Sequence, residues 1–209
     1  MTQTSECPPA LPGFEHIHRY WDKTRGKYAA KIHPGELYVT HTSELISTVL
    51  GSCIAVCIRD PAKGIGGMNH FMLPATNNKK LSIGADLSAA ARYGNFAMEH
   101  LINSILRFGG SKARFEIKVF GGGKVLAQMT NIGLQNIKFV RDYISIEGLK
   151  IVAEDTGGIH PRKVVYNPIS GKVAMKKLKA IHNNTIEARE TRYRDGLSLS
   201  KVEGEVDLF

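Results

Sequence analysis

The sequence predicts an α+β fold with mixed β-sheets, and three observations lead to this class. Short β-rich runs come first along the chain, and helical patterns mixed with further strands follow them. Glycine is enriched, at 21 of 209 residues, which indicates many tight turns and therefore many strands. Hydrophobic residues make up 43% and charged residues 22%, so the chain can build the core of a globular domain.

The first predicted strands precede any helical pattern. Turn residues bound them, such as Asp60-Pro61 and Lys63-Gly64, and Pro74 closes the last one. These strands cover residues 36–40, 45–49, 54–58 and 65–73. The segment Gly51-Ser52-Cys53 therefore falls at the junction between two strands.

Two helices are predicted where apolar residues recur at spacings of three and four. The first covers residues 87–108 and ends at Gly109-Gly110. The second covers residues 131–147, with Asn131 as its cap and Gly148 as its stop. Further strands are predicted at residues 115–120, 149–153, 163–166 and 172–175.

Two short segments imitate functional motifs. Gly121-Gly122-Gly123 precedes Lys124, but the spacing and the following hydroxyl residue of a phosphate-binding loop are missing. We interpret these glycines as a turn packed close to other backbone. Glu154-Asp155 suggests a pair of acids, which we interpret as a strand-end turn that shapes a groove and not as catalytic residues.

The predicted catalytic domain spans residues 36–178. Residues 1–35 are polar and mixed, so we expect an N-terminal arm, and residues 179–209 form a charged C-terminal tail that we expect to be flexible or weakly helical. No run reaches the roughly 18 apolar residues that cross a membrane. The N-terminus lacks the pattern of a secretory signal. We therefore expect a cytoplasmic protein with no membrane insertion.

The formal net charge of +9 has an ordinary explanation in solubility and a functional one in an acidic partner. Nucleic acid is a poor candidate, because no zinc-finger, helix-turn-helix or aromatic RNA-binding motif accompanies the charge. An acidic protein partner fits better.

Cys53 is the first candidate for chemistry. The odd number of cysteines argues against a disulfide framework, and Cys53 and Cys57 lie too far apart along one strand to be bridged. Gly51 before it permits a sharp turn, which can expose a thiol at a strand end and aim N–H groups at one point. An accessible sulfur beside such donors is what cysteine acyl transfer requires.

His70 is the candidate base, since a free thiol needs help to ionise at neutral pH. It lies inside an apolar run on the strand that follows the Cys53 strand, and antiparallel pairing would bring the two together. The other histidines fall in turns, on a helix or in the terminal segments. The ordinary alternatives are a buried apolar cysteine and a core histidine. A zinc site of Cys53, Cys57 and His70 is disfavoured, because no fourth ligand is evident.

Several blocks of the chain together resemble the CheD family of chemoreceptor glutamine deamidases. Each block alone is short, but their order is specific, and they cover roughly residues 36–178. The blocks are Leu50-Gly51-Ser52-Cys53-Ile54-Ala55-Val56-Cys57, Gly66-Gly67-Met68-Asn69-His70-Phe71-Met72-Leu73-Pro74, Arg92-Tyr93-Gly94-Asn95-Phe96-Ala97-Met98, Val119-Phe120-Gly121-Gly122-Gly123, Asn131-Ile132-Gly133 and Ala153-Glu154-Asp155-Thr156-Gly157-Gly158.

The resemblance implies hydrolysis of glutamine side chains on methyl-accepting chemotaxis receptors, with no metal or organic cofactor. It places the nucleophile at Cys53 and the base at His70, with Gly51 and Ser52 in the turn that forms the oxyanion hole. A hydroxyl residue that orients the histidine falls on Ser47 or on its neighbour Thr48. The implied fold is a layered α/β sandwich related to the catalytic domain of necrotizing-factor toxin deamidases.

Two other functions stay open at this point. The resemblance also implies a binding module that docks to a CheC-like chemotaxis phosphatase, or a methylesterase that uses the same site on glutamyl methyl esters. An intact pair of Cys53 and His70 favours an enzyme over a pure adaptor. We expect a monomer.

Overall fold

The computed structural model describes residues 6–73, 85–125, 132–178 and 183–199, and within them the chain forms two five-stranded sheets. The first sheet has the order β1 (Arg19–Asp22), β2 (Lys27–Lys31), β4 (Leu45–Leu50), β9 (Arg162–Tyr166) and β10 (Val173–Lys177). The second sheet has the order β3 (Leu37–Thr40), β6 (Ile65–Phe71), β5 (Ile54–Asp60), β7 (Glu116–Gly121) and β8 (Ile151–Thr156). Each sheet contains one parallel pair, β2 with β4 and β7 with β8. The predicted α+β class with mixed sheets is confirmed.

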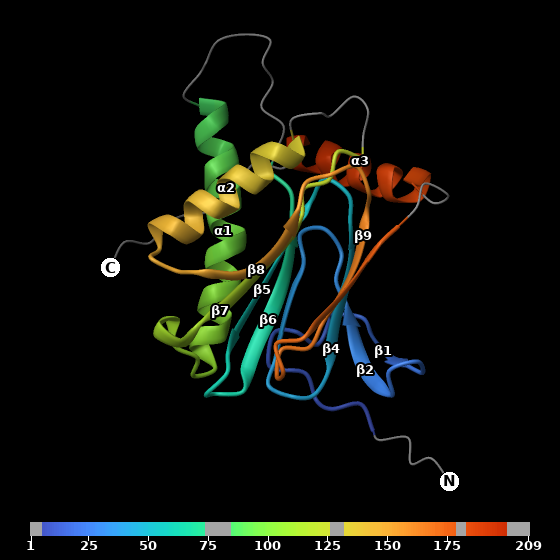
Figure 1. Cartoon of the computed structure of the whole chain (residues 1–209), viewed down its shortest axis with the longest axis vertical. Coiled ribbons are helices and arrows are strands. Elements are labelled where there is room, and N and C mark those ends of the chain that lie inside the picture. The colour runs from blue at the N-terminus through green and yellow to red at the C-terminus, as the bar shows by residue number, and fades with distance from the viewer. Residues whose placement is uncertain (1–5, 74–84, 126–131, 179–182, 200–209) are drawn as a thin grey trace.

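The helices are α1 (Ala85–Arg107), α2 (Ile132–Ile146) and α3 (Asn183–Leu199), and a single 3₁₀ turn, η1, covers Lys112–Arg114. Helices α1 and α2 pack on strands of the second sheet, and Figure 1 shows the first sheet on the other side of that sheet. Helix α3 lies across the end of the strands, next to the upper end of β9. The molecule is therefore layered as helices, second sheet and first sheet.

The second sheet is the centre of the core. All residues of β6 are buried and almost all of β5, as expected for strands covered on both faces. One continuous apolar cluster joins both sheets to the helices, and its largest fully buried side chains include Tyr38, Phe71 and Tyr166. The continuous apolar runs around Cys53 and His70 are thus the middle of a sandwich, and they hold both residues rigidly.

Two segments expected to lie outside the domain are part of the fold. Strands β1 and β2 fall within the expected arm of residues 1–35 and pair with each other, with Trp21 opposite Tyr28. Each strand has charged residues at its ends and only two to three apolar or aromatic residues between them, so no apolar run marks them. Helix α3 falls within the expected tail of residues 179–209 and is mostly polar, so packing and not composition defines it. The predicted cap at Asn131 lies outside the described residues.

The described helices include none that is both long and apolar enough to cross a membrane.

Asp60 at the end of β5 is a fully buried carboxylate with a complete set of partners. It accepts hydrogen bonds from the Arg114 guanidinium, the closest at 2.6 Å, and from the backbone N–H groups of Ala62, Lys63 and Ser111. The hydrogen bonds from Arg114 lower the pKa of Asp60 from 3.8 to about 2. The carboxylate thereby ties the β5–β6 turn to η1.

Asp60→Asn is expected to lower the stability of the fold at neutral pH. Because the pKa of Asp60 is lower in the folded state, its stabilising effect is complete above pH 4 and is lost as the pH falls through about 2. Urea unfolding at a series of pH values should show the gap between wild type and Asp60→Asn closing below about pH 4. Asp142→Asn, which removes a mostly exposed carboxylate on α2, is the control with little effect. A gap that stayed constant with pH would contradict this role of Asp60.

Candidate active site

The loop Gly51–Cys53 carries the chain from the first sheet to the second, since β4 ends at Leu50 and β5 begins at Ile54. Cys53 is completely buried there and is a free thiol. The backbone N–H of Gly122 donates to the Cys53 carbonyl at 2.8 Å, and that of Gly123 donates to the Gly51 carbonyl at 2.7 Å. The first and last residues of the loop are thus both hydrogen-bonded to the glycines that follow β7.

The glycines after β7 are required by this close approach. Gly121 has φ +115°, and a Cβ atom at that position would overlap the carbonyl oxygen of Cys53. A Cβ atom at Gly122 would meet the Ile137 side chain, and φ there is +65°. The prediction of a turn packed close to other backbone is confirmed, and its function is to clamp the Cys53 loop.

Asn136 supports the same loop from α2. Its Nδ2 donates to the Ser52 carbonyl at 2.9 Å, and its Oδ1 accepts from the Leu73 N–H at 2.9 Å. The side chain is fully buried and connects the Cys53 loop to the end of the His70 strand. The sequence prediction missed Asn136, although a polar residue on an apolar helix face beside Ile137 and Val140 was an available signal.

His70 reaches the site as the strand pattern predicts. Strands β5 and β6 are antiparallel, and His70 pairs with Ala55, two residues from Cys53. The His70 backbone is also fixed on its other edge, where its N–H donates to the Glu36 carbonyl at 3.0 Å. The side chain is buried, and its Nε2 has no hydrogen-bond partner within the described residues.

Thr48, and not Ser47, meets His70. Thr48 Oγ1 lies 2.7 Å from His70 Nδ1 and donates its proton to the Ile32 carbonyl at 2.9 Å. Because the hydroxyl has a single hydrogen, it accepts from an Nδ1–H, which leaves Nε2 as the unprotonated nitrogen. Ser47 points the other way, toward Tyr20 Oη at 3.4 Å, as neighbouring residues of a strand do. Of the two residues left open, Thr48 is therefore the one that contacts His70.

Glu190 is a second residue at the site that the sequence prediction missed, because it lies in the segment expected to be a tail. Its side chain extends from α3 to the Cys53 loop. Oε1 accepts from the N–H groups of Gly51 at 2.7 Å and Cys53 at 3.3 Å. Oε2 accepts from the Ser52 N–H at 2.9 Å and from Ser52 Oγ at 2.6 Å. The Gly51–Cys53 turn thus binds both oxygens of a carboxylate.

Ligand atoms of Cys53, His70 and Glu190 lie within 4.8 Å of one another, a grouping that could hold a metal ion. The N–H groups that point at Glu190 favour an anion at this position and oppose a cation. Cys57, the other ligand considered for zinc, is not part of the group and is buried in β5 between β6 and β7. The donor set therefore fits an acyl or carboxylate group better than zinc.

The site is electrically neutral at Cys53 and His70 in this arrangement. Burial, together with the nearby charge of Glu190, raises the pKa of the Cys53 thiol well above its usual value. Burial, together with the positive charges of His33 and Arg189, lowers the pKa of His70 to about 3. The structure therefore holds a thiol and a neutral imidazole and not an ion pair.

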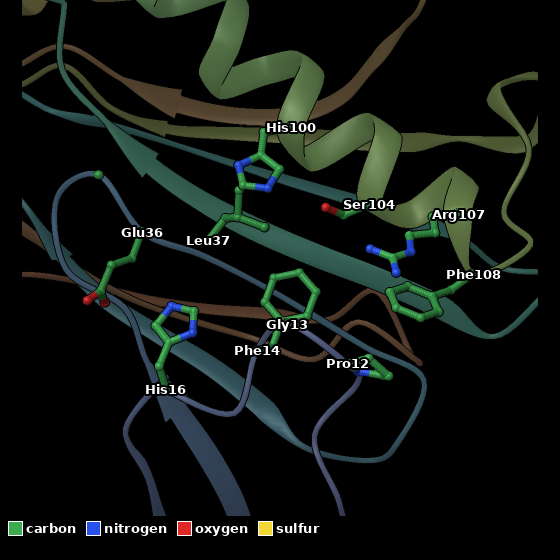
Figure 2. Close-up of a pocket in the computed structure, with 11 residues that line it drawn as sticks. Pro12, Gly13, Phe14, His16, Glu36, Leu37, His100, Ser104, Arg107 and Phe108 are labelled. Atoms are coloured by element: carbon green, nitrogen blue, oxygen red, sulfur yellow. The ribbon is translucent and has the colours of Figure 1, made fainter. Parts of the chain in front are cut away.

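Two surface hollows lie near these residues. One of about 370 Å³ reaches Thr48 and is lined by basic side chains, among them Lys31, Lys163 and Arg189. The other, of about 190 Å³, lies between the N-terminal segment and α1, where Figure 2 shows His16 and Phe14 on one side and His100 and Arg107 on the other. This second hollow contains none of the predicted site residues.

Gly121→Ala is expected to lower the free energy of unfolding by about 3 kcal/mol or more, because a side chain adds both a positive-φ strain and an overlap with Cys53. Gly148→Ala is the matched control: φ is +65° there, but no atom lies within 4 Å of the new Cβ, so a cost of about 1 kcal/mol is expected. Denaturant unfolding of both variants measures the difference. Equal costs would show that the close approach to Cys53 is not the constraint.

Comparisons with known proteins identify the family of this chain. A family model described as CheD chemotactic sensory transduction matches residues 62–177. A probable chemoreceptor glutamine deamidase CheD from Hahella chejuensis is 53% identical over 203 residues, which cover 97% of this chain and 95% of the relative. Another, from Halorhodospira halophila, is 50% identical over 203 residues, which cover 97% and 94% of the two chains. A third, from Hydrogenovibrio crunogenus, is 50% identical over 188 residues, which cover 90% and 97%. The chain belongs to the CheD family.

Proposed function

We propose that this protein is a chemoreceptor glutamine deamidase, which hydrolyses glutamine side chains on the cytoplasmic region of methyl-accepting chemotaxis receptors to glutamate and ammonia. Family membership and the names of its relatives support the reaction. The observation that carries it is the glutamate side chain already held beside Cys53 and His70 by the Gly51–Cys53 turn. A site that binds the carboxylate of glutamate can also receive the carboxamide of glutamine, which has the same length and shape.

In the first half of the reaction, Cys53 is the nucleophile and His70 is the base. His70 Nε2 takes the proton from the thiol, and the sulfur forms a bond to the carboxamide carbon of glutamine. The negative charge moves to the carboxamide oxygen, where the N–H groups of Gly51, Ser52 and Cys53 stabilise it. His70 then gives its proton to the amide nitrogen, the carbon–nitrogen bond breaks, and ammonia leaves a thioester.

In the second half, water replaces the sulfur. His70 Nε2 accepts a proton from the water, whose oxygen bonds to the thioester carbon, and the same N–H groups hold the second oxyanion. The carbon–sulfur bond then breaks, the thiol regains its proton, and glutamate is the product. Thr48 acts as a positioning residue throughout, because it holds Nδ1 and keeps Nε2 turned into the site.

The direct test is mass spectrometry of a purified receptor cytoplasmic fragment incubated with the protein. Specific glutamines should become glutamates with wild type, and Cys53→Ala should abolish the conversion because the thioester cannot form. Cys7→Ala removes the exposed cysteine and should retain full activity. Conversion that persisted in Cys53→Ala would refute the assignment of the nucleophile. An intact wild type without activity on its cognate receptor would favour docking to a CheC-like phosphatase, and faster release of glutamyl methyl esters would favour a methylesterase.

Thr48→Ala is expected to lower kcat roughly tenfold to a hundredfold with little change in KM, because the imidazole loses the partner that orients it. Thr48→Ser keeps the hydroxyl and should restore most of the activity. Ser47→Ala should behave as wild type, since its hydroxyl makes only long contacts away from His70. Steady-state kinetics with the receptor fragment would distinguish them. If Ser47→Ala lost activity and Thr48→Ala did not, the proposed role of Thr48 would be wrong.

A further inference from the structure

Helix α3 lies across the end of the sheets where the Cys53 loop crosses between them (Figure 1). Three side chains on one face of this helix anchor it: Ile186, Glu190 and Tyr193, at relative positions i, i+4 and i+7. Ile186 is buried, and Tyr193 packs against Gly35 and is hydrogen-bonded to Tyr93 of α1. A helix with anchors at this spacing is seated as an amphipathic helix sits in a groove.

The middle anchor, Glu190, is only 2% exposed and has the chemical identity of the reaction product. Both of its oxygens are held by donors alone, three backbone N–H groups and the Ser52 hydroxyl. These are the groups that stabilise the oxyanion in the proposed reaction. A carboxylate accepts at all four contacts, whereas a carboxamide would turn an NH₂ group toward donors. The turn therefore holds Glu190 as it would hold a glutamate just formed.

Helix α3 also closes the site. Cys53 has no exposed surface, and His70 is 1% exposed, so no receptor side chain can reach either one in this arrangement. The neutral thiol follows from the same closure, since burial and Glu190 keep the proton on the sulfur. The closed form described by the structure is inactive as it stands.

We propose that α3 is an intramolecular inhibitor that occupies the substrate site as a mimic of the product, with Glu190 in the place of the modified side chain. This inference rests on the proposed function. Helix α3 has to leave before a receptor glutamine enters, so the receptor helix and α3 compete for one surface. The apparent affinity for the receptor then depends on the difference in binding free energy between the receptor helix and α3. Any ligand that holds α3 away from the Cys53 loop activates the enzyme.

The rival interpretation makes Glu190 a catalytic acid in a triad with Cys53 and His70. A triad acid binds the nitrogen of the imidazole that faces away from the nucleophile. In this structure Thr48 occupies His70 Nδ1, and Glu190 is bound to the Gly51–Cys53 turn instead. The two interpretations predict opposite effects of Glu190→Gln: activation if Glu190 is an inhibitor, and loss of activity if it is a catalytic acid.

The test uses iodoacetamide labelling of the full-length protein, followed by mass spectrometry of each cysteine. The chain contains its own references: Cys7 is exposed and should be labelled in every variant, whereas Cys57 is buried in the core and should stay unlabelled unless the protein unfolds. Glu190→Gln and Ile186→Ala each remove one anchor of α3 and should increase the labelling rate of Cys53 about tenfold or more. Ile186→Ala is included because it leaves the charge beside the thiol unchanged. Asp195→Asn changes an exposed carboxylate on the same helix and should label as wild type does.

Receptor deamidation by the same variants completes the test. The expected result is a severalfold increase in kcat/KM for Glu190→Gln and for Ile186→Ala, with Asp195→Asn unchanged. If labelling of Cys53 increased but neither wild type nor any variant deamidated the receptor, the proposal that α3 covers the site would stand and the proposed deamidase activity would be refuted. Unchanged labelling in both anchor variants, or loss of deamidation in Glu190→Gln with wild-type activity in Ile186→Ala, would overturn the proposal.

Discussion

The hydrogen bonds from Gly122 and Gly123 to the carbonyls of Cys53 and Gly51 are the contacts on which the site depends. They hold the one loop where the chain passes from the first sheet to the second, and they turn its N–H groups toward a single point. Asn136 adds a bond from the helix layer to the same loop. Because the clamp is built from backbone groups, it tolerates no side chain at Gly121, and the geometry of the oxyanion hole is set by the fold before any ligand arrives.

Both sheets contribute to the site, and neither is sufficient. The first sheet supplies Thr48, the second supplies His70, and the loop between them supplies Cys53. The layered arrangement brings these residues together in its interior, where burial keeps both the thiol and the imidazole uncharged. Such a site becomes reactive when it is opened and a substrate replaces the buried carboxylate, so access and chemistry are controlled by the same helix.

The strands around the site were predictable because turn residues bound their apolar runs, and the helices because their apolar residues recur at spacings of three and four. The antiparallel pairing of consecutive strands also placed His70 beside Cys53. Strands β1 and β2 were not predicted, since each has charged residues at both ends and only two to three apolar or aromatic residues between them. Glu190 was not predicted because α3 is polar over most of its length, and its position is decided by tertiary contacts such as Tyr193 with Tyr93. The choice of Thr48 over Ser47 required knowing which face of β4 meets the other sheet.

The backbone carbonyl of Ile32 limits how far the chain can be shortened at its N-terminal end without losing the site. It accepts the only proton of the Thr48 hydroxyl, and by doing so it fixes which nitrogen of His70 is protonated. Without Ile32 the Thr48 hydroxyl would be released to donate to His70 Nδ1. The imidazole proton would then lie on Nε2, which would no longer offer a lone pair to the Cys53 thiol. A fragment reduced to residues 62–177, the part that the family model matches, would lack Cys53 and Thr48 as well as this acceptor. The smallest functional unit of the chain therefore extends back at least to Ile32, and the tautomer of its base is selected by the backbone carbonyl of the residue that follows β2.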